Sequence, residues 1–195
     1  MEEKINLLVS QLGEIRVKKD ADIGEYLGEN YKGKIGALYI ATSVSELIKV
    51  VTLCEELNIT YLLIGSGSKV FIKDSKLPVL IIKNRSKNLK IFGVKGKVSR
   101  SGIGIKEAFV EADSGVTLPD LAAFSESQGL AGFDDLRLSK STVGGSILSN
   151  KILQDKVTQI IVLSNKNTEN RKEIQELSSN EVILRVIFHL KAREV

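Results

Sequence analysis

The chain has 195 residues, 43% of them hydrophobic and 27% charged, a composition typical of a globular protein with one large domain or two small lobes. No run approaches the roughly 18 consecutive apolar residues of a membrane span, and the acidic start Met1-Glu2-Glu3-Lys4 lacks a signal-peptide pattern. The net charge of +4 is modest, and Cys54, the only cysteine, excludes an internal disulfide. We therefore expect a cytoplasmic protein with no membrane partner.

An N-terminal helix is the first predicted element. Apolar residues with helical spacing run from Ile5 to Leu12, and Gly13 follows as a stop signal. A polar, glycine-punctuated stretch over 14–36 comes next, and residues 37–41 then predict a strand.

A helix and a second strand complete a β-α-β start. Ser43 and Glu46 form a predicted capping box. The apolar stripe behind them ends at Cys54, whose neighbours include no His or Asn to activate a thiolate, so we assign it to the core. The strand 61–64 follows after a short loop.

The rest of the chain predicts short strands around one more helix. Thr117 and Asp120 flank Pro119 at the start of that helix, which ends near Gly129. Strands are expected over 70–72, 79–82, 89–92, 109–112, 159–163 and 182–188.

This order of elements predicts an α+β fold of two lobes, with a boundary between Ile72 and Val79. The expected divisions are an N-terminal helix (1–13), a first lobe (about 14–74), a second lobe (about 79–190) and a tail (191–195). A single open parallel sheet is not expected.

Neither nucleic-acid binding nor metal chemistry is indicated. Seven Lys and Arg residues lie between Lys83 and Arg100, but only Phe92 interleaves them, so we expect a lysine-rich hairpin that protects a sheet edge. His189, the only histidine, alternates with apolar residues in a strand-like run, which favours a structural or surface role over metal ligation.

Two clusters of small residues carry the strongest functional signal. The first, Gly65-Ser66-Gly67-Ser68 with Lys69 beside it, follows the strand 61–64. Glycine lets the backbone approach a ligand and turn its N–H groups toward an anion, and serine hydroxyls add donors. The second cluster, over 139–146, has hydroxyls, paired glycines and a lysine. Such a pair suits an extended ligand whose diphosphate is held from two sides, although a simple turn explains the first cluster equally well.

The spacing of these clusters excludes two common phosphate loops. Gly-x-Gly-x-x-Gly is absent, and so is Gly-x-x-x-x-Gly-Lys-Ser/Thr. A Rossmann dehydrogenase and a nucleoside-triphosphate hydrolase are therefore disfavoured.

The clusters resemble the flavin-binding region of the UDP-N-acetylenolpyruvoylglucosamine reductase family, which belongs to the vanillyl-alcohol-oxidase-like flavoproteins. That family has a Gly-x-Gly-Ser-Asn-hydrophobic loop after a strand, and a flavin-contacting Pro-Gly-Thr-Val-Gly-Gly motif. The matching runs here are 64–74 and Lys140-Ser141-Thr142-Val143-Gly144-Gly145, and the resemblance covers roughly residues 14–190. It implies a two-lobed PCMH-type fold, FAD as cofactor and a flavin-dependent oxidoreductase of peptidoglycan-precursor synthesis.

The resemblance also assigns cofactor-binding residues. Most lie in the two clusters, and Asn150 takes the place of an asparagine that follows the family's second motif. The expected FAD-binding residues are Ile64, Gly65, Ser66, Gly67, Ser68, Lys69, Val70, Ser141, Thr142, Val143, Gly144, Gly145, Ser146 and Asn150.

Departures from the family pattern limit the expected activity. Lys69 replaces the loop asparagine, Lys140-Ser141 replaces Pro-Gly, and the stretch after Asn150 is shortened. The family's Tyr-Arg-x-Ser element has no match between 165 and 181, and its substrate-binding domain, with a proton-donating serine and a glutamate, has no counterpart in these residues. The expected function is a FAD-binding module that is not a complete reductase by itself, with a second protein chain supplying the substrate-binding groups.

Charged residues near the second cluster are assigned backbone roles. Asp134 and Asp135 are expected to cap or hydrogen-bond the backbone rather than to serve as catalytic acids, and Arg137 faces either the diphosphate or solvent. The alternative to flavin binding is a non-catalytic relative that has lost the cofactor and works as an interaction or regulatory module.

Overall fold

The computed structural model describes residues 2–27, 33–68, 70, 76–99, 102–164, 169–178 and 180–193. The chain divides into two compact units, Met1–Ser86 and Lys87–Val195, which we call the N-terminal and the C-terminal unit. Each unit has its own sheet, as expected for an α+β fold of two lobes.

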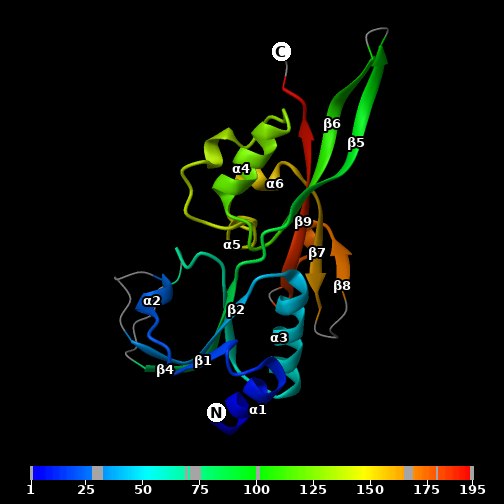
Figure 1. Cartoon of the computed structure of the whole chain (residues 1–195). Coiled ribbons are helices and arrows are strands. Elements are labelled where there is room, and N and C mark those ends of the chain that lie inside the picture. The colour runs from blue at the N-terminus through cyan, green and yellow to red at the C-terminus, as the bar shows by residue number, and fades with distance from the viewer. Residues whose placement is uncertain are drawn as a thin grey trace. The chain divides into compact units, whose positions relative to one another are not determined.

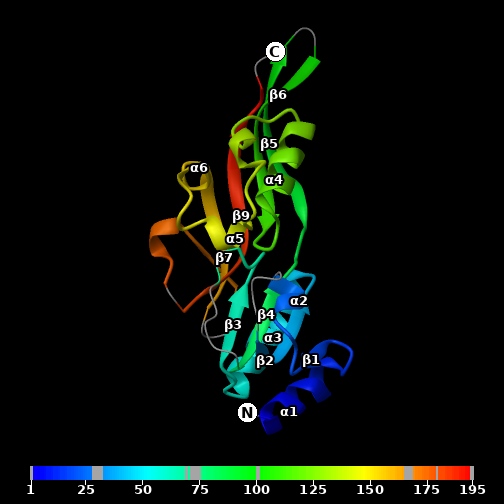
Figure 2. The same cartoon turned by 90° about the vertical axis from the view of Figure 1, so that its left-hand side faces the viewer.

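The N-terminal unit is built on a mixed four-stranded sheet. Its strand order is β1-β2-β4-β3, with β1 antiparallel to β2 and the other pairs parallel. β4 runs between β2 and β3 (Figure 2). The strands are β1 (Val17–Lys19), β2 (Lys34–Ala41), β3 (Tyr61–Ile64) and β4 (Lys76–Asn84).

The position of β4 corrects the expected lobe boundary. Sequence spacing assigns residues from Val79 onward to a second lobe, but β4 pairs with both β2 and β3. The N-terminal unit therefore extends to Ser86 rather than ending near Asp74. Of the strand predicted over 70–72, Val70 is not in a strand and the rest lies outside the described residues.

Helices α1 (Glu2–Leu12) and α3 (Val44–Glu56) pack on each other in this unit, and Lys4 Nζ donates to the Asn58 carbonyl at 2.9 Å. One of the two hydrogen bonds of the predicted capping box of α3 forms: Ser43 Oγ accepts from the Glu46 N–H at 3.2 Å. The Glu46 carboxylate instead reaches Thr42, accepting from its N–H at 2.8 Å. The predicted stripe is buried through Cys54, and burial raises the pKa of that thiol to about 12, so it belongs to the core.

The polar stretch between Gly13 and β2 contains two elements that the sequence pattern did not reveal. These are β1, at the sheet edge, and the short helix α2 (Gly24–Leu27). Ile23, just before α2, is 1% exposed and joins a cluster with Leu38, Ile64 and Ile81.

The C-terminal unit is built on an antiparallel five-stranded sheet. The strand order is β5-β6-β9-β7-β8. The strands are β5 (Leu89–Ser99), β6 (Gly102–Asp113), β7 (Val157–Leu163), β8 (Glu169–Lys172) and β9 (Val182–Lys191). Each predicted strand is present, and β5 and β6 form a much longer hairpin than expected (Figure 1).

Helices α4 (Leu118–Ser127), α5 (Val143–Ser146) and α6 (Lys151–Gln154) gather beside β9 and β6 (Figure 1). Their apolar side chains share one core with β6, β7 and β9, including Phe133 packed edge-on against Phe188. Thr117 caps α4 by accepting from the Asp120 N–H at 3.2 Å, as predicted. The single-turn helices η1 (Asp134–Leu136) and η2 (Ile174–Glu176) complete the unit.

The predicted basic hairpin over 83–100 is divided between the two sheets, because the buried Lys83 belongs to β4 whereas Lys90 belongs to β5. β5 is the edge strand, and its Lys90 pairs with Glu111 at 2.9 Å. His189 Nε2 lies 3.0 Å from Glu107 Oε2, and its ring stacks on Phe109. Among the described residues, no three His, Cys, Asp or Glu side chains are grouped to hold a metal ion, and no helix is long and apolar enough to cross a membrane.

Candidate functional site

The first small-residue cluster forms a tight loop directly after β3. Gly67 is buried and has a φ of +88°, a conformation that side chains other than glycine rarely adopt. The Val70 N–H donates to the Gly67 carbonyl at 3.0 Å, and the Ser66 and Ser68 hydroxyls lie 3.1 Å apart. Lys69 lies outside the described residues. The backbone of this loop therefore has a shape that only glycine supports well.

The loop lies at the carboxyl ends of the three parallel strands β2, β4 and β3. Ile64, the last residue of β3, pairs with Lys83 in β4, which in turn pairs with Ile40 in β2. Residues that follow these strands share one edge of the sheet, and ligands of parallel sheets bind at that edge. This end of the sheet therefore includes Thr42, Arg85 and Gly65, which follow β2, β4 and β3.

Two polar residues at this edge were missed by sequence reasoning. Lys83 is 6% exposed, its Nζ donates to the Tyr26 carbonyl, and burial together with Arg85 lowers its pKa. Ser86 is fully buried, and its Oγ has no hydrogen-bond partner among the described residues. A buried hydroxyl without a partner costs about 1–3 kcal/mol, so Ser86 is suited to a group from outside these residues.

A signal for Lys83 was present in the sequence. Ile81 and Lys83 are two residues apart in one strand, so their side chains lie on the same face. Since Ile81 is buried, Lys83 falls on an inner face rather than in a run of surface lysines.

The second cluster has a different construction. Thr142 is the N-cap of α5, and its Oγ1 accepts from the Gly145 N–H at 3.3 Å. The Val143 N–H donates to the Val116 carbonyl, and the Gly144 N–H donates to the Ser114 carbonyl, both at 2.8 Å. These backbone donors are consumed within the unit.

Gly144 is required by close packing rather than by backbone conformation. A Cβ at this position would lie 2.9 Å from Ser114 Cβ and 3.1 Å from the Ser114 carbonyl oxygen. Gly145 is exposed, and a Cβ there would meet only Thr142 Oγ1 at 3.2 Å. Gly144 therefore has a packing role, whereas Gly145 lies at the surface.

Asn150 and Ser146 also have structural positions. The Asn150 side chain caps α6 by accepting from the Leu153 N–H at 3.3 Å. Ser146 is 2% exposed, whereas Ser141 is half-buried. Because the two clusters belong to different units, their arrangement around one cleft stays a prediction.

The carboxylates near the second cluster are held by cations or backbone. Arg193 pairs with Asp134 and holds the pKa of that carboxyl below its ordinary value. Arg137 pairs with Glu126 of α4 at the surface. Asp113, next to Ser114, is 4% exposed, and burial raises its pKa. It accepts from the Asn88 N–H at 3.0 Å and lies near Arg185, so its position is structural.

Comparison with known proteins agrees with this geometry. The family model described as FAD binding domain matches residues 35–159, which include both clusters. UDP-N-acetylenolpyruvoylglucosamine reductase of Clostridium beijerinckii is 25% identical over 179 residues, covering 92% of this chain and 55% of its own. The reductase of Clostridium kluyveri is 27% identical over 190 residues, covering 90% of this chain and 58% of its own. The chain thus spans about half the length of these relatives.

A solved structure shares the fold. P-cresol methylhydroxylase with substrate bound superposes with a TM-score of 0.68 at 13% identity, covering 99% of this chain and 44% of that one. The likeness confirms the PCMH-type α+β fold expected from the sequence.

Proposed function

This chain belongs to the FAD binding domain family, and we propose from that premise that the loop Gly65–Val70 holds the diphosphate of FAD. FAD is the cofactor of this domain, which is similar to the flavin domain of the reductases. Residues 141–146 of the second cluster would lie alongside the diphosphate or near the flavin ring. The proposal rests on Gly67, whose backbone is buried and has a positive φ. An ordinary turn that accepts any residue would not need this conformation, which favours glycine.

The residues present fit a diphosphate. The Ser66 and Ser68 hydroxyls lie in the loop, and the Ser86 hydroxyl, which has no hydrogen-bond partner among the described residues, follows the neighbouring strand β4. Hydroxyls and backbone N–H groups are donors that diphosphates accept, and they tolerate exchange among small residues. When bound, FAD supplies hydride transfer.

Reduction of a substrate needs more than the described residues provide. A catalytic acid must be placed against the substrate, whereas Asp134 is paired with Arg193 and Asp113 is held by Asn88 and Arg185. We therefore propose that these 195 residues bind flavin, and that UDP-N-acetylenolpyruvoylglucosamine is reduced only when a second chain supplies substrate-binding and acid groups.

Titration of the purified chain with FAD tests the first part. We expect saturable binding of one FAD per chain, with a Kd of about 1 μM or below and a flavin absorption spectrum that persists after gel filtration. A colourless protein that quenches no flavin fluorescence would instead support the alternative of a relative that has lost its cofactor. None of the comparisons favours that alternative.

A steady-state assay tests the second part. FAD-loaded protein with NADPH and the enolpyruvyl substrate is expected to show no turnover, because missing substrate orientation alone removes about 7–11 kcal/mol of barrier lowering and a missing acid a further factor of about 10²–10⁴. Slow bleaching of the flavin by NADPH is compatible with this result. Turnover at rates typical of enzymes, about 1–10³ s⁻¹, would overturn the need for a second chain.

Cytoplasmic localisation is proposed on the same footing. A buried cysteine without a disulfide partner suits a reducing compartment. Cell fractionation with an antibody against the chain would test it, and recovery in a membrane or exported fraction would contradict it.

A further inference from the structure

A pocket on one face of the N-terminal sheet is lined by residues other than those of the loop Gly65–Val70 that the structure describes. It has a volume of about 320 Å³, near the lower end of the range for small-molecule sites. Its lining comes from the segment around β1, from β2 and from the end of β4, and it includes none of the described loop residues, 65–68 and 70. Its strand residues Lys18, Leu38 and Ile40 belong to β1 and β2, on the side of β4 away from β3, whereas Arg85 follows β4 at the end of the sheet where the loop also begins.

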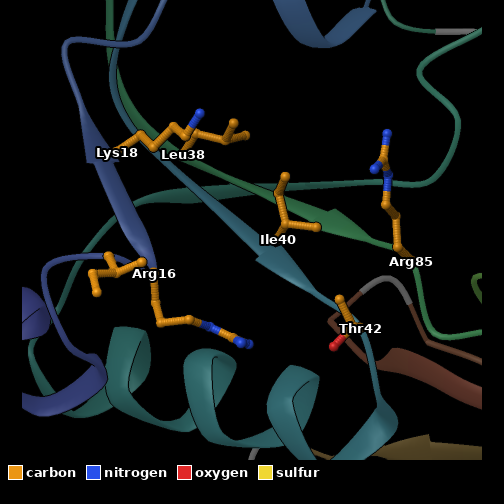
Figure 3. Close-up of a pocket in the computed structure, with 7 residues that line it drawn as sticks. Arg16, Lys18, Leu38, Ile40, Thr42 and Arg85 are labelled. Carbon is orange, nitrogen blue, oxygen red and sulfur yellow. The ribbon is translucent and has the colours of Figure 1, made fainter.

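The floor of the pocket is apolar. Leu38 and Ile40 are two residues apart in β2 and therefore point to the same face. Lys18 pairs with Leu38 across the β1–β2 ladder, and Arg85 follows β4. Figure 3 shows Ile40 between Lys18 and Arg85.

The walls are cationic, and a carboxylate balances the charge of only one of the three cations among the described residues. Arg16 pairs with Glu46 at 2.5 Å, which neutralises it. Lys18 Nζ donates to the Tyr26 hydroxyl at 2.6 Å, and neither Lys18 nor Arg85 has an ion-pair partner in the described part of the chain. Among the residues that the structure describes, no carboxylate lines the pocket.

A buried cation adds to this charge. Lys83 lies on the same face as Ile40, two residues before Arg85, and donates to the Tyr26 carbonyl. Burial, and in addition the charge of Arg85, lowers the pKa of Lys83, as expected for two cations that lie two residues apart. An anion bound beside Arg85 would relieve this repulsion.

We propose that this pocket binds a small organic anion, with the phosphate or carboxylate group held by Arg85 and Lys18 and the apolar body resting on Leu38 and Ile40. The Arg85 guanidinium has the fork geometry that matches either anion through two parallel hydrogen bonds, and Lys18 contributes a point charge. The apolar floor explains why an inorganic ion alone would use the site poorly, because it buries no apolar surface.

Calorimetric titration with phenyl phosphate, benzoate, inorganic phosphate and benzyl alcohol tests the proposal. It uses protein with and without FAD, so that a filled flavin loop cannot account for the binding. We expect phenyl phosphate or benzoate to bind with a Kd of about 0.1–1 mM in both forms, inorganic phosphate at least about tenfold more weakly, and benzyl alcohol not at all. Preference between the first two probes identifies the anion as phosphate or carboxylate.

Variants locate the binding. Arg85→Gln and Lys18→Gln are each expected to weaken it about tenfold, because each removes one charge-assisted contact. Lys49→Gln removes the same charge from an exposed position on α3 and is the matched control, with no change expected. Absence of saturable binding, an equal loss in Lys49→Gln, or displacement of the probe by FAD would overturn a separate anion site.

Discussion

The two small-residue clusters have nearly the same composition but use their glycines in different ways. In the first, Gly67 is needed for its backbone conformation, with a φ of +88°. In the second, Gly144 has no unusual φ, and its missing side chain instead makes room for Ser114. The first cluster shapes a loop at the end of β3, and the second packs a short helix against the end of β6.

This difference teaches that glycine and hydroxyl content alone does not identify a phosphate site. The Thr142 hydroxyl and the Val143 and Gly144 amides, which look like ligand donors in the sequence, are engaged within the C-terminal unit. We therefore expect flavin affinity to depend mainly on the first cluster and stability on the second.

The largest expected effect comes from Gly67→Val. A β-branched residue is strained at this φ and blocks the close approach of the backbone to the ligand, so FAD affinity should fall at least about 100-fold. Fluorescence titration with FAD measures this loss.

Gly13→Val is the matched control for backbone strain. Gly13 has a φ of +93°, and a Cβ at this position would meet no atom within 4 Å, so the substitution carries a similar strain of about 1–3 kcal/mol without touching the loop. Its FAD affinity should stay within about threefold of the wild type. Equal losses in the two variants would mean that Gly67 acts only through stability.

Gly144→Ala should have the next largest effect, on stability. The new Cβ meets backbone and Cβ atoms of Ser114 that cannot rotate away, so we expect a loss of about 1–3 kcal/mol in the free energy of unfolding. Gly145→Ala meets only the Thr142 hydroxyl and should change stability by less than about 1 kcal/mol. Urea denaturation compares the two, and a larger loss at Gly145 would contradict the packing role of Gly144.

Asn150 allows capping to be separated from flavin contact. Asn150→Ala should cost about 1 kcal/mol, because α6 loses its N-cap, while Asn150→Asp keeps an acceptor for the Leu153 N–H and should restore most of that stability. If Asn150 also donates its amide to FAD, Asn150→Asp will regain stability but not affinity. Denaturation and FAD titration of both variants decide between the two roles.

The smallest effect concerns Lys83, beside the first cluster. Its pKa in the folded state is lowered, so the folded chain releases this proton more readily than the unfolded chain. The free energy of unfolding contributed by Lys83 should therefore rise with pH between the lowered pKa and the ordinary value of 10.5. Urea denaturation of wild type and Lys83→Met across this range should show the rise only in the wild type. A matching rise in Lys83→Met would assign it to other groups.

Much of the fold could be predicted from local signals. The strand β3 has the predicted bounds, and Ser43 and Thr117 mark the starts of α3 and α4 because capping is decided by neighbours in sequence. β1 and α2 were not predicted, since three- and four-residue elements in a polar stretch leave no periodicity to detect. The lobe boundary was wrong because the pairing of β4 depends on contacts between distant residues.

The sequence predicted the two clusters of the candidate site, but not which of their donors are already engaged within the protein. The unusual backbone of Gly67 follows from the glycine itself, whereas the consumption of the Gly144 amide depends on Ser114, thirty positions earlier. Arg85 and Lys83 look like members of a surface lysine run until the sheet places their side chains over Ile40 and beside Tyr26.

In both sheets the strand that comes last in the sequence occupies an inner position. β4 joins β2 to β3, and β9 joins β6 to β7, although neither of the joined pairs is itself hydrogen-bonded. During synthesis on the ribosome, the loop after β3 therefore cannot be anchored until residue 84 has emerged, and the hairpins β5–β6 and β7–β8 remain unconnected until β9 arrives. Each unit should consequently fold late and all at once, and a nascent chain halted before β4 or β9 would expose unpaired strand edges to aggregation and to chaperones.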